Sequence, residues 1–205
     1  MRTTTNTTAL TVAAGVLAAS LLLVGCSSSG SDGADEPSGP EAGQGASGSS
    51  SEAAPTDLTG QLTPVGSCDD AAALLGDLVA DLTLQEAQSS STDAASTCAW
   101  SSDPTDAGDI RVIALQLQRQ ELSAEEIATQ ADAAAQQIGG AVVEDERAAS
   151  FDGDALTGTT EAAGLGVSIG SAVTPEGVVV VSATGAGGAP LTPEESLDAA
   201  FLFVE

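Results

Sequence analysis

The stretch Val178-Val179-Val180-Val181 decides the expected fold because it places four β-branched apolar residues in a row. Such residues favour extended strands, and a run that is apolar on both faces is typical of a strand with cover on each side. We therefore expect residues 178–184 to form a central strand of a sheet, covered on both faces.

The residues before this strand predict its neighbours. Thr174-Pro175-Glu176-Gly177 has the proline and glycine of a tight turn, which joins the strand to an apolar segment at residues 165–173 as a hairpin. Upstream, Ile113, Leu115 and Leu117 alternate with other residues, which predicts a strand with one buried face. Strands are also expected at residues 98–100, 110–118, 141–144 and 155–160, and a polar loop at residues 88–97.

Helices are expected to pack on these strands. Ser67 and Asp69 can cap a helix through residues 71–75, which either ends at Gly76 or continues to about Asp81. Ser123-Ala124-Glu125-Glu126 is a capping box, and Pro193 suits the first turn of a last helix. The predicted buried stripes are Ile127, Ala131, Ala134, Ala135 and Ile138, ended by Gly139-Gly140, and Leu197, Ala200, Phe201 and Val204. The fold class is α+β, an antiparallel-rich sheet with two to three helices packed on it in two layers.

The amino-terminal residues predict export and a lipid anchor. Arg2 precedes an apolar run from Ala9 to Val24 that is shorter than a membrane-spanning helix, which is the pattern of a signal peptide. The run ends in Leu23-Val24-Gly25-Cys26, which resembles a bacterial lipobox with Cys26 as the acylated first mature residue. Acylation would hold the protein on the extracytoplasmic face of the cell membrane. A buried or unpaired cysteine is the alternative.

The composition of the chain divides it into three parts. Residues 1–25 are the expected signal peptide, and residues 26–63 are the acylated cysteine with a Ser-, Gly- and Pro-rich tether. Because the tether has almost no large apolar residue, we expect it to be disordered, with a root-mean-square span of roughly 30–40 Å. Residues 64–205 are the expected extracytoplasmic domain.

Two cysteines remain once Cys26 is acylated. Cys68 and Cys98 are expected to form a structural disulfide, since paired cysteines are usual in exported proteins. A redox pair normally has closer spacing, and two cysteines without histidine make a poor zinc site. Trp100 lies two residues after Cys98, so a strand would place both on one face with the indole over the bridge.

These residues resemble a family. A cysteine before a short Ala/Leu helix, the Cys98-x-Trp100 pattern and Gly153-Asp154-Ala155 in mid-domain are similar to small actinobacterial exported lipoproteins grouped as a domain of unknown function. The resemblance covers most of residues 65–205. It implies an envelope lipoprotein with one α+β domain, a helix–strand disulfide and no established activity. The extracellular sensor domains of actinobacterial receptor kinases also look similar around paired cysteines, which makes a sensor role an analogy only.

Composition argues against several classes of function. The chain has 30 acidic and 4 basic residues and no histidine, giving a formal charge of −26. Nucleic acid and anionic membrane surfaces are therefore poor partners. Without histidine or lysine there is no Ser-His-Asp triad, Cys-His pair, Schiff base or Ser-Lys pair. No cofactor is implied.

Carboxylates are the remaining candidates for chemistry. The densest groups are Glu144-Asp145-Glu146 and Asp152-Gly153-Asp154, where Asp152 and Asp154 are candidate calcium ligands. Because no full calcium loop is present, solvated loops are the favoured interpretation. Arg111, Arg119 and Arg147 are each expected to pair with a surface carboxylate, for about 0–1 kcal/mol.

These observations favour a non-catalytic binding or interaction module in the cell envelope. The membrane partner is reached through the lipid on Cys26, and the other partner is an envelope protein or a small apolar ligand. A carrier of an apolar or lipid ligand is the first alternative. A hydrolase that relies on Asp and Glu alone is the second, disfavoured because aromatic and basic residues are scarce.

Overall fold

An antiparallel sheet forms the centre of the structure. The computed structural model describes residues 58–103 and 110–205. In chain order the strands are β1 (Thr83–Leu84), β2 (Ser90–Ser91), β3 (Ala95–Ser101), β4 (Arg111–Arg119), β5 (Ala141–Val143), β6 (Asp154–Ala162), β7 (Leu165–Thr174) and β8 (Gly177–Ala186). The α-helices are α1 (Cys68–Leu75), α2 (Ala124–Ile138), α3 (Glu146–Ala149) and α4 (Pro193–Phe201), and short 3₁₀ helices lie at Gly76–Leu78 and Glu86–Gln88.

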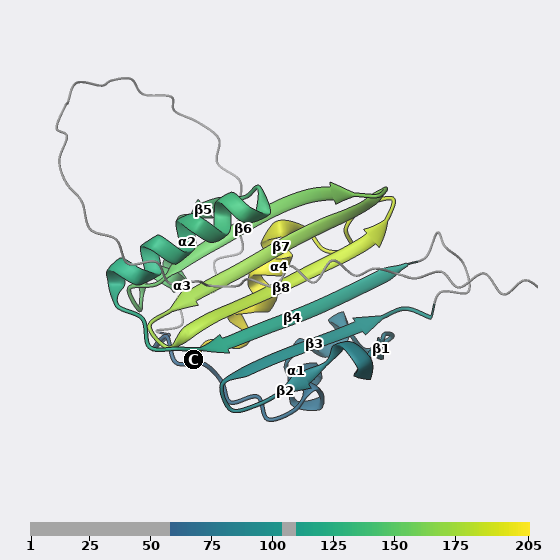
Figure 1. Cartoon of the computed structure of the whole chain (residues 1–205), viewed down its shortest axis with the longest axis horizontal. Coiled ribbons are helices and arrows are strands. Elements are labelled where there is room, and N and C mark those ends of the chain that lie inside the picture. Colours follow the sequence, from purple (N-terminus) through teal and green to yellow (C-terminus); the bar gives the residue numbers. More distant parts are fainter. Residues whose placement is uncertain (1–57, 104–109) are drawn as a thin grey trace, which may run out of the picture. The chain divides into compact units, whose positions relative to one another are not determined.

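The strand order places β8 near the middle of the sheet and leaves two different edges. The order is β1-β3-β4-β8-β7-β6-β5, and β2 pairs with β3 as well (Figure 1). Ser91 pairs with Ser96 and Leu84 with Trp100, so β2 and β1 together line the outer side of β3. At the other edge, β5 pairs with only the first part of β6, from Ala155 to Thr157.

The valine run lies in β8 as predicted, between β4 and β7. Val179 and Val181 are fully buried on one face of the sheet, whereas Val178 and Val180 on the other face are half-buried. The expected central position is therefore confirmed. The expectation of full cover on both faces is wrong, because α2, the helix on the second face, packs against β5, β6 and β7 and reaches only the start of β8 at Val178.

The helices are divided between the two faces. α1, α3 and α4 pack on the face that carries Val179 and Val181, together with Leu115 and Trp100. α2 packs on the opposite face, where its apolar stripe contacts Leu156 and Val173 of β6 and β7. Figure 1 shows α2 in front of the sheet and α4 behind it. The α+β class is confirmed, and α2 adds a partial layer on the second face.

Local sequence signals explain where the helices begin and end. The Ser67 side chain accepts a hydrogen bond from the backbone N–H of Asp70, and Gly76 ends α1. The capping box of Ser123 and Glu126 is formed, and α2 ends at Gly139 in the left-handed conformation. A second capping box joins Thr192 to Glu195 at the start of α4.

The domain begins earlier than the expected boundary at residue 64. Leu62 is 3% exposed and forms an isolated bridge with Val204. The Thr63 N–H donates to the Phe203 carbonyl at 3.0 Å, and the Glu205 N–H donates to the Gln61 carbonyl at 2.8 Å. Residues 59–63 therefore pair with the carboxyl-terminal residues, and the apolar side chains of Leu58 and Leu62 pack in the main core.

The polar loop expected at residues 88–97 is also wrong in part. β2 and the first residues of β3 lie within it, and Ser96 is 1% exposed. The Ser91 and Ser96 hydroxyls are 2.7 Å apart, and Ser96 Oγ also donates to the Val65 carbonyl at 3.4 Å. Ser96 is thus buried through hydrogen bonds. The start of β3 therefore lacks the apolar pattern from which a strand is normally predicted.

The amino-terminal predictions fall on residues that the structure does not describe. The signal peptide, Cys26 and residues 27–57 of the tether lie outside 58–103 and 110–205. Among the residues in those two ranges, no helix has the length and apolar character needed to span a membrane.

Candidate functional site

The predicted disulfide joins α1 to β3. Cys68, the first residue of α1, is bonded to Cys98, and their Cα atoms are 5.6 Å apart. Cys98 is fully buried, and Trp100 is 3% exposed in the same core cluster on the same face of β3. The disulfide therefore ties the first helix to β3 within the buried core.

The two acidic stretches of the sequence meet around one hollow. A hollow of about 590 Å³ lies beside β5, α3 and the start of β6. Its lining residues are Val142, Val143, Glu144, Asp145, Glu146, Ala148, Ala149, Gly153, Asp154 and Ala155. Asp154 is thus brought to Glu144-Asp145-Glu146, whereas the exposed Asp152 is not part of the lining. This hollow, which gathers residues of both acidic stretches, is the candidate site.

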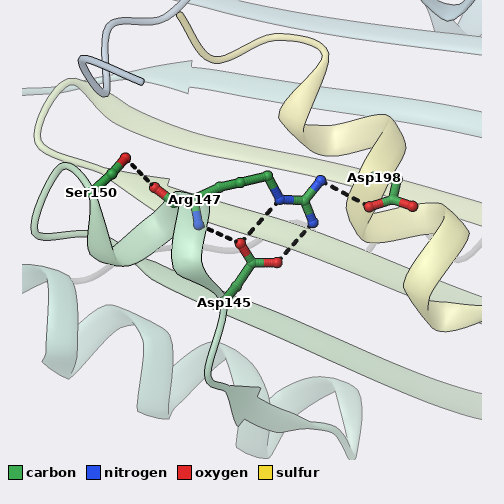
Figure 2. A network of polar contacts seen from close by, with 4 residues as sticks. All are labelled: Asp145, Arg147, Ser150 and Asp198. Atoms are coloured by element: carbon green, nitrogen blue, oxygen red, sulfur yellow. Dashed lines mark hydrogen bonds and ion pairs between the residues drawn. The ribbon is translucent and has the colours of Figure 1, made fainter. Parts of the chain in front are cut away.

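Asp145, one of the residues that line this hollow, is held by Arg147 (Figure 2). Asp145 Oδ2 accepts a hydrogen bond from Arg147 Nη2 at 2.7 Å, and Oδ1 accepts one from Nε at 3.0 Å. Oδ1 also accepts the Arg147 backbone N–H at 2.9 Å, which caps α3. The carboxylate is therefore fixed by its own helix and by a two-pronged ion pair.

Arg147 also connects α3 to α4. Its Nη1 donates to Asp198 Oδ1 at 2.8 Å, and the guanidinium carbon lies 4.0 Å from the centre of the Phe201 ring. Phe201 in turn packs against Phe151, with ring centres 6.5 Å apart. Arg147 therefore combines a carboxylate on each side with an aromatic face, an arrangement that fastens two helices together.

These contacts change the pKa of both partners. Partial burial raises the pKa of Asp145, but the hydrogen bonds and positive charge of Arg147 outweigh it and leave this pKa below its usual value. The pKa of Arg147 lies above its usual value, mainly because its side chain donates hydrogen bonds to Asp145. Both groups are charged at neutral pH. Asp145 is therefore deprotonated in the ion pair and has no proton to donate as a general acid.

The Asp145–Arg147 pair predicts loss of stability in acid. Because the pKa of Asp145 is lower in the folded than in the unfolded state, its stabilisation is complete above the unfolded value of about 3.9 and is lost as the pH falls through the folded value. Asp145→Asn should cost about 1 kcal/mol at neutral pH and flatten this acid dependence. Urea unfolding at a series of pH values measures both effects.

The neighbouring Asp198 provides the control for this prediction. Its side chain is 66% exposed, so Asp198→Asn should lower the free energy of unfolding at neutral pH less than Asp145→Asn does. The chain has no histidine, so we also expect the stability to be nearly constant between about pH 6 and 8. Equal effects of the two variants would contradict the assigned role of Asp145.

The other carboxylates of the hollow do not form a metal site. Among the residues that the structure describes, no group of three or more Asp, Glu or Cys side chains is arranged to hold a metal ion. Asp152, one of the two candidate calcium ligands, is exposed and has a positive φ of 56°. The prediction of solvated loops fits the exposed Glu144 and Asp152 only, because Asp145 is half-buried in its ion pair with Arg147 and the half-buried Asp154 begins β6.

The three arginines within the described residues are held in different ways. Arg111 pairs with Asp81, and both side chains are largely exposed. Arg119 departs from the expectation, because it donates to the Leu62 and Thr63 carbonyls at 3.0 and 2.7 Å instead of pairing with a carboxylate. Residues 62–63 place two carbonyls beside the end of β4, a contact that sequence spacing does not reveal. All three guanidinium groups thus have partners within the domain.

Comparison of the chain with known protein families, with curated proteins and with solved structures finds no match.

Proposed function

We propose that this protein is a membrane-anchored extracytoplasmic lipoprotein whose α+β domain is a non-catalytic binding or interaction module of the cell envelope. The Cys68–Cys98 disulfide is the observation that carries the proposal, because such bonds persist in oxidising compartments outside the cytoplasm. The disulfide agrees with the extracytoplasmic location that the lipobox-like Leu23-Val24-Gly25-Cys26 predicts.

The charge of the domain supports an interaction role of a particular kind. The chain carries a formal charge of −26, and its arginines at 111, 119 and 147 are engaged within the domain. Most carboxylates are therefore available to a partner, and electrostatic attraction favours a basic protein over nucleic acid or an anionic membrane.

The hollow beside β5 does not favour the alternatives. Its lining combines valines and alanines with Glu144, Glu146 and Asp154, so an apolar cargo would bury carboxylates there at a cost. Its best-held carboxylate, Asp145, is bound to Arg147. A binding module therefore accounts for these side chains better than a lipid carrier or a hydrolase does.

Replacement of Cys26 tests the membrane anchor. We expect Cys26→Ser to release the protein into the medium or to leave it unprocessed, because the residue that would carry the lipid is removed. Ser28→Ala, which leaves Leu23-Val24-Gly25-Cys26 intact, is the matched control and should stay in the membrane fraction. Fractionation and intact mass measurement check the result, and an unchanged mature mass with full membrane retention of Cys26→Ser would contradict lipidation.

The interaction role has its own test. The mature protein is cross-linked in the intact envelope, extracted gently from its membranes and weighed by native mass spectrometry. A stable heteromeric mass would support an interaction module, and a bound small molecule would favour the carrier. A bare monomer without any cross-linked product would contradict both kinds of binding.

A further inference from the structure

We infer, on the basis of the proposed interaction role, that the outer edge of β6 at Thr159–Glu161 binds an extended segment of a basic protein as an added strand. The structural reason is that this edge ends the sheet without a neighbour. β5 lines β6 only as far as Thr157, and Gly158 lies against Ile138 and Gly140 at the end of α2. Beyond that point Thr159, Thr160 and Glu161 are exposed.

The register of the β6–β7 hairpin identifies the backbone groups that face outward. The two-residue turn Ala163-Gly164 makes Ala162 and Leu165 a hydrogen-bonded pair. Bonded and non-bonded pairs alternate along an antiparallel ladder, so the pairs of Thr159 with Ser168 and of Glu161 with Gly166 are non-bonded. The N–H and C=O groups of Thr159 and Glu161 therefore point away from β7, toward the open edge.

These outward groups have no partner within the residues that the structure describes. The backbone hydrogen bonds outside the helices and strands do not include Thr159 or Glu161. The opposite edge of the sheet differs, because β1 and β2 together line β3 there. Figure 1 shows β6 continuing along the outer edge of the sheet past β5 and α2. An open edge of this kind is a template for strand addition.

The edge lacks several of the usual protections against pairing. Residues 159–161 read Thr-Thr-Glu, without the proline, lysine or bulge that commonly prevents strand addition. Thr favours strands, and Glu161 is the one charge of the exposed segment. Its carboxylate forms no ion pair with the arginines that the structure describes. A lysine or arginine directly opposite Glu161 would form a favourable cross-strand pair.

Charge decides between the candidate occupants of the edge. A second copy of this chain would bring together two molecules with a formal charge of −26 each, and like-charged molecules repel. A basic segment is attracted by the same charge, both in the encounter and opposite Glu161. The edge therefore fits an extended, lysine- or arginine-bearing strand from another protein, with threonine or valine at the neighbouring positions.

A synthetic peptide tests this assignment on the mature protein. The probe is an N-acetylated peptide that alternates lysine with threonine and valine, and amide hydrogen exchange is followed by NMR. Without peptide, the Thr159 and Glu161 amides should exchange rapidly, and with peptide both should become protected. The same peptide with glutamate in place of lysine, or with alternate amides methylated, should not protect them.

Variants of the edge separate strand addition from other binding. Thr159→Pro removes an outward N–H without removing a bond to β7, so the fold should survive and binding of the lysine peptide should be lost. Glu161→Gln should weaken binding by up to about fivefold. Thr160→Ala, whose backbone groups face β7, is the matched control and should bind normally, and far-UV circular dichroism confirms that each variant is folded.

The remaining outcomes overturn the inference. Absence of protection at the solubility limit of the peptide, or binding that survives Thr159→Pro, would show that the edge is not the docking site. Protection of Thr159 and Glu161 in the protein alone, rising with protein concentration, would assign the edge to a second copy instead. If the edge fails but cross-linking in the envelope still yields a heteromeric complex, the interaction role stands and its surface lies elsewhere.

Discussion

Reduction of the Cys68–Cys98 bond should lower the free energy of unfolding by about 3–4 kcal/mol, which is a large part of the 5–15 kcal/mol typical of a domain. The two cysteines are 30 positions apart, so the bond closes a long loop and restricts the unfolded chain strongly. In the folded state the same bond fixes α1 against β3.

Denaturant unfolding with and without a reductant measures this effect. The reduced protein should unfold at lower urea, and its m-value should rise because the unfolded chain is less compact. The double variant Cys68→Ala, Cys98→Ala is the control, since its unfolding should not depend on the reductant. An equal response to the reductant by the variant, or two free thiols in protein taken from the envelope, would contradict a structural disulfide.

The parts of the fold that sequence predicts are those with short-range signals. The helix α2 follows from Ser123, Glu126 and Gly139, because capping groups lie next to the residues that they bond. The β7–β8 hairpin follows from Pro175 and Glu176, the two residues that separate its strands. In each case the sequence signal and the hydrogen bond that it produces lie within a few residues of one another.

The parts that sequence does not predict depend on distant partners. Leu62 pairs with Val204, and Arg147 reaches Asp198 and Phe201 on another helix. Ser96 is buried through hydrogen bonds to Ser91 and Val65. No local sequence pattern predicts such contacts. Serine and arginine are usually exposed, so without knowledge of the partner each is predicted to lie on the surface.

The candidate site also combines features that the sequence predicts with features that depend on distant partners. The acidic stretches were visible in the sequence, but only the structure brings Asp154 to Glu144 and Glu146 around one hollow. The free edge of β6 was not predicted at all. Its strand was expected at residues 155–160, but an edge is defined by which strands are neighbours, and one strand's own sequence does not contain that information.

The close approach of α4 to β7 gives the second large expected effect, at Gly170. A methyl group built on Gly170 would lie 2.0 Å from the Leu197 backbone nitrogen and 2.2 Å from the Ser196 carbonyl carbon. Because these are helix backbone atoms, no side-chain rotation relieves the overlap. Beside it, the buried Ser168 and Ser196 hydroxyls are 2.9 Å apart and form a hydrogen bond that depends on the same close packing.

We therefore expect Gly170→Ala to destabilise the domain by about 3 kcal/mol, at the upper end of the usual cost of overpacking. Either α4 moves away from the sheet, and the Ser168–Ser196 bond is strained or broken, or β7 shifts against its neighbours. Gly66→Ala is the matched control, since its methyl group would meet only the Asp70 carboxylate, at 3.3 Å, and should change stability by no more than about 0.5 kcal/mol. Urea unfolding compares the two variants, and similar midpoints would show that α4 does not lie this close to β7 in solution.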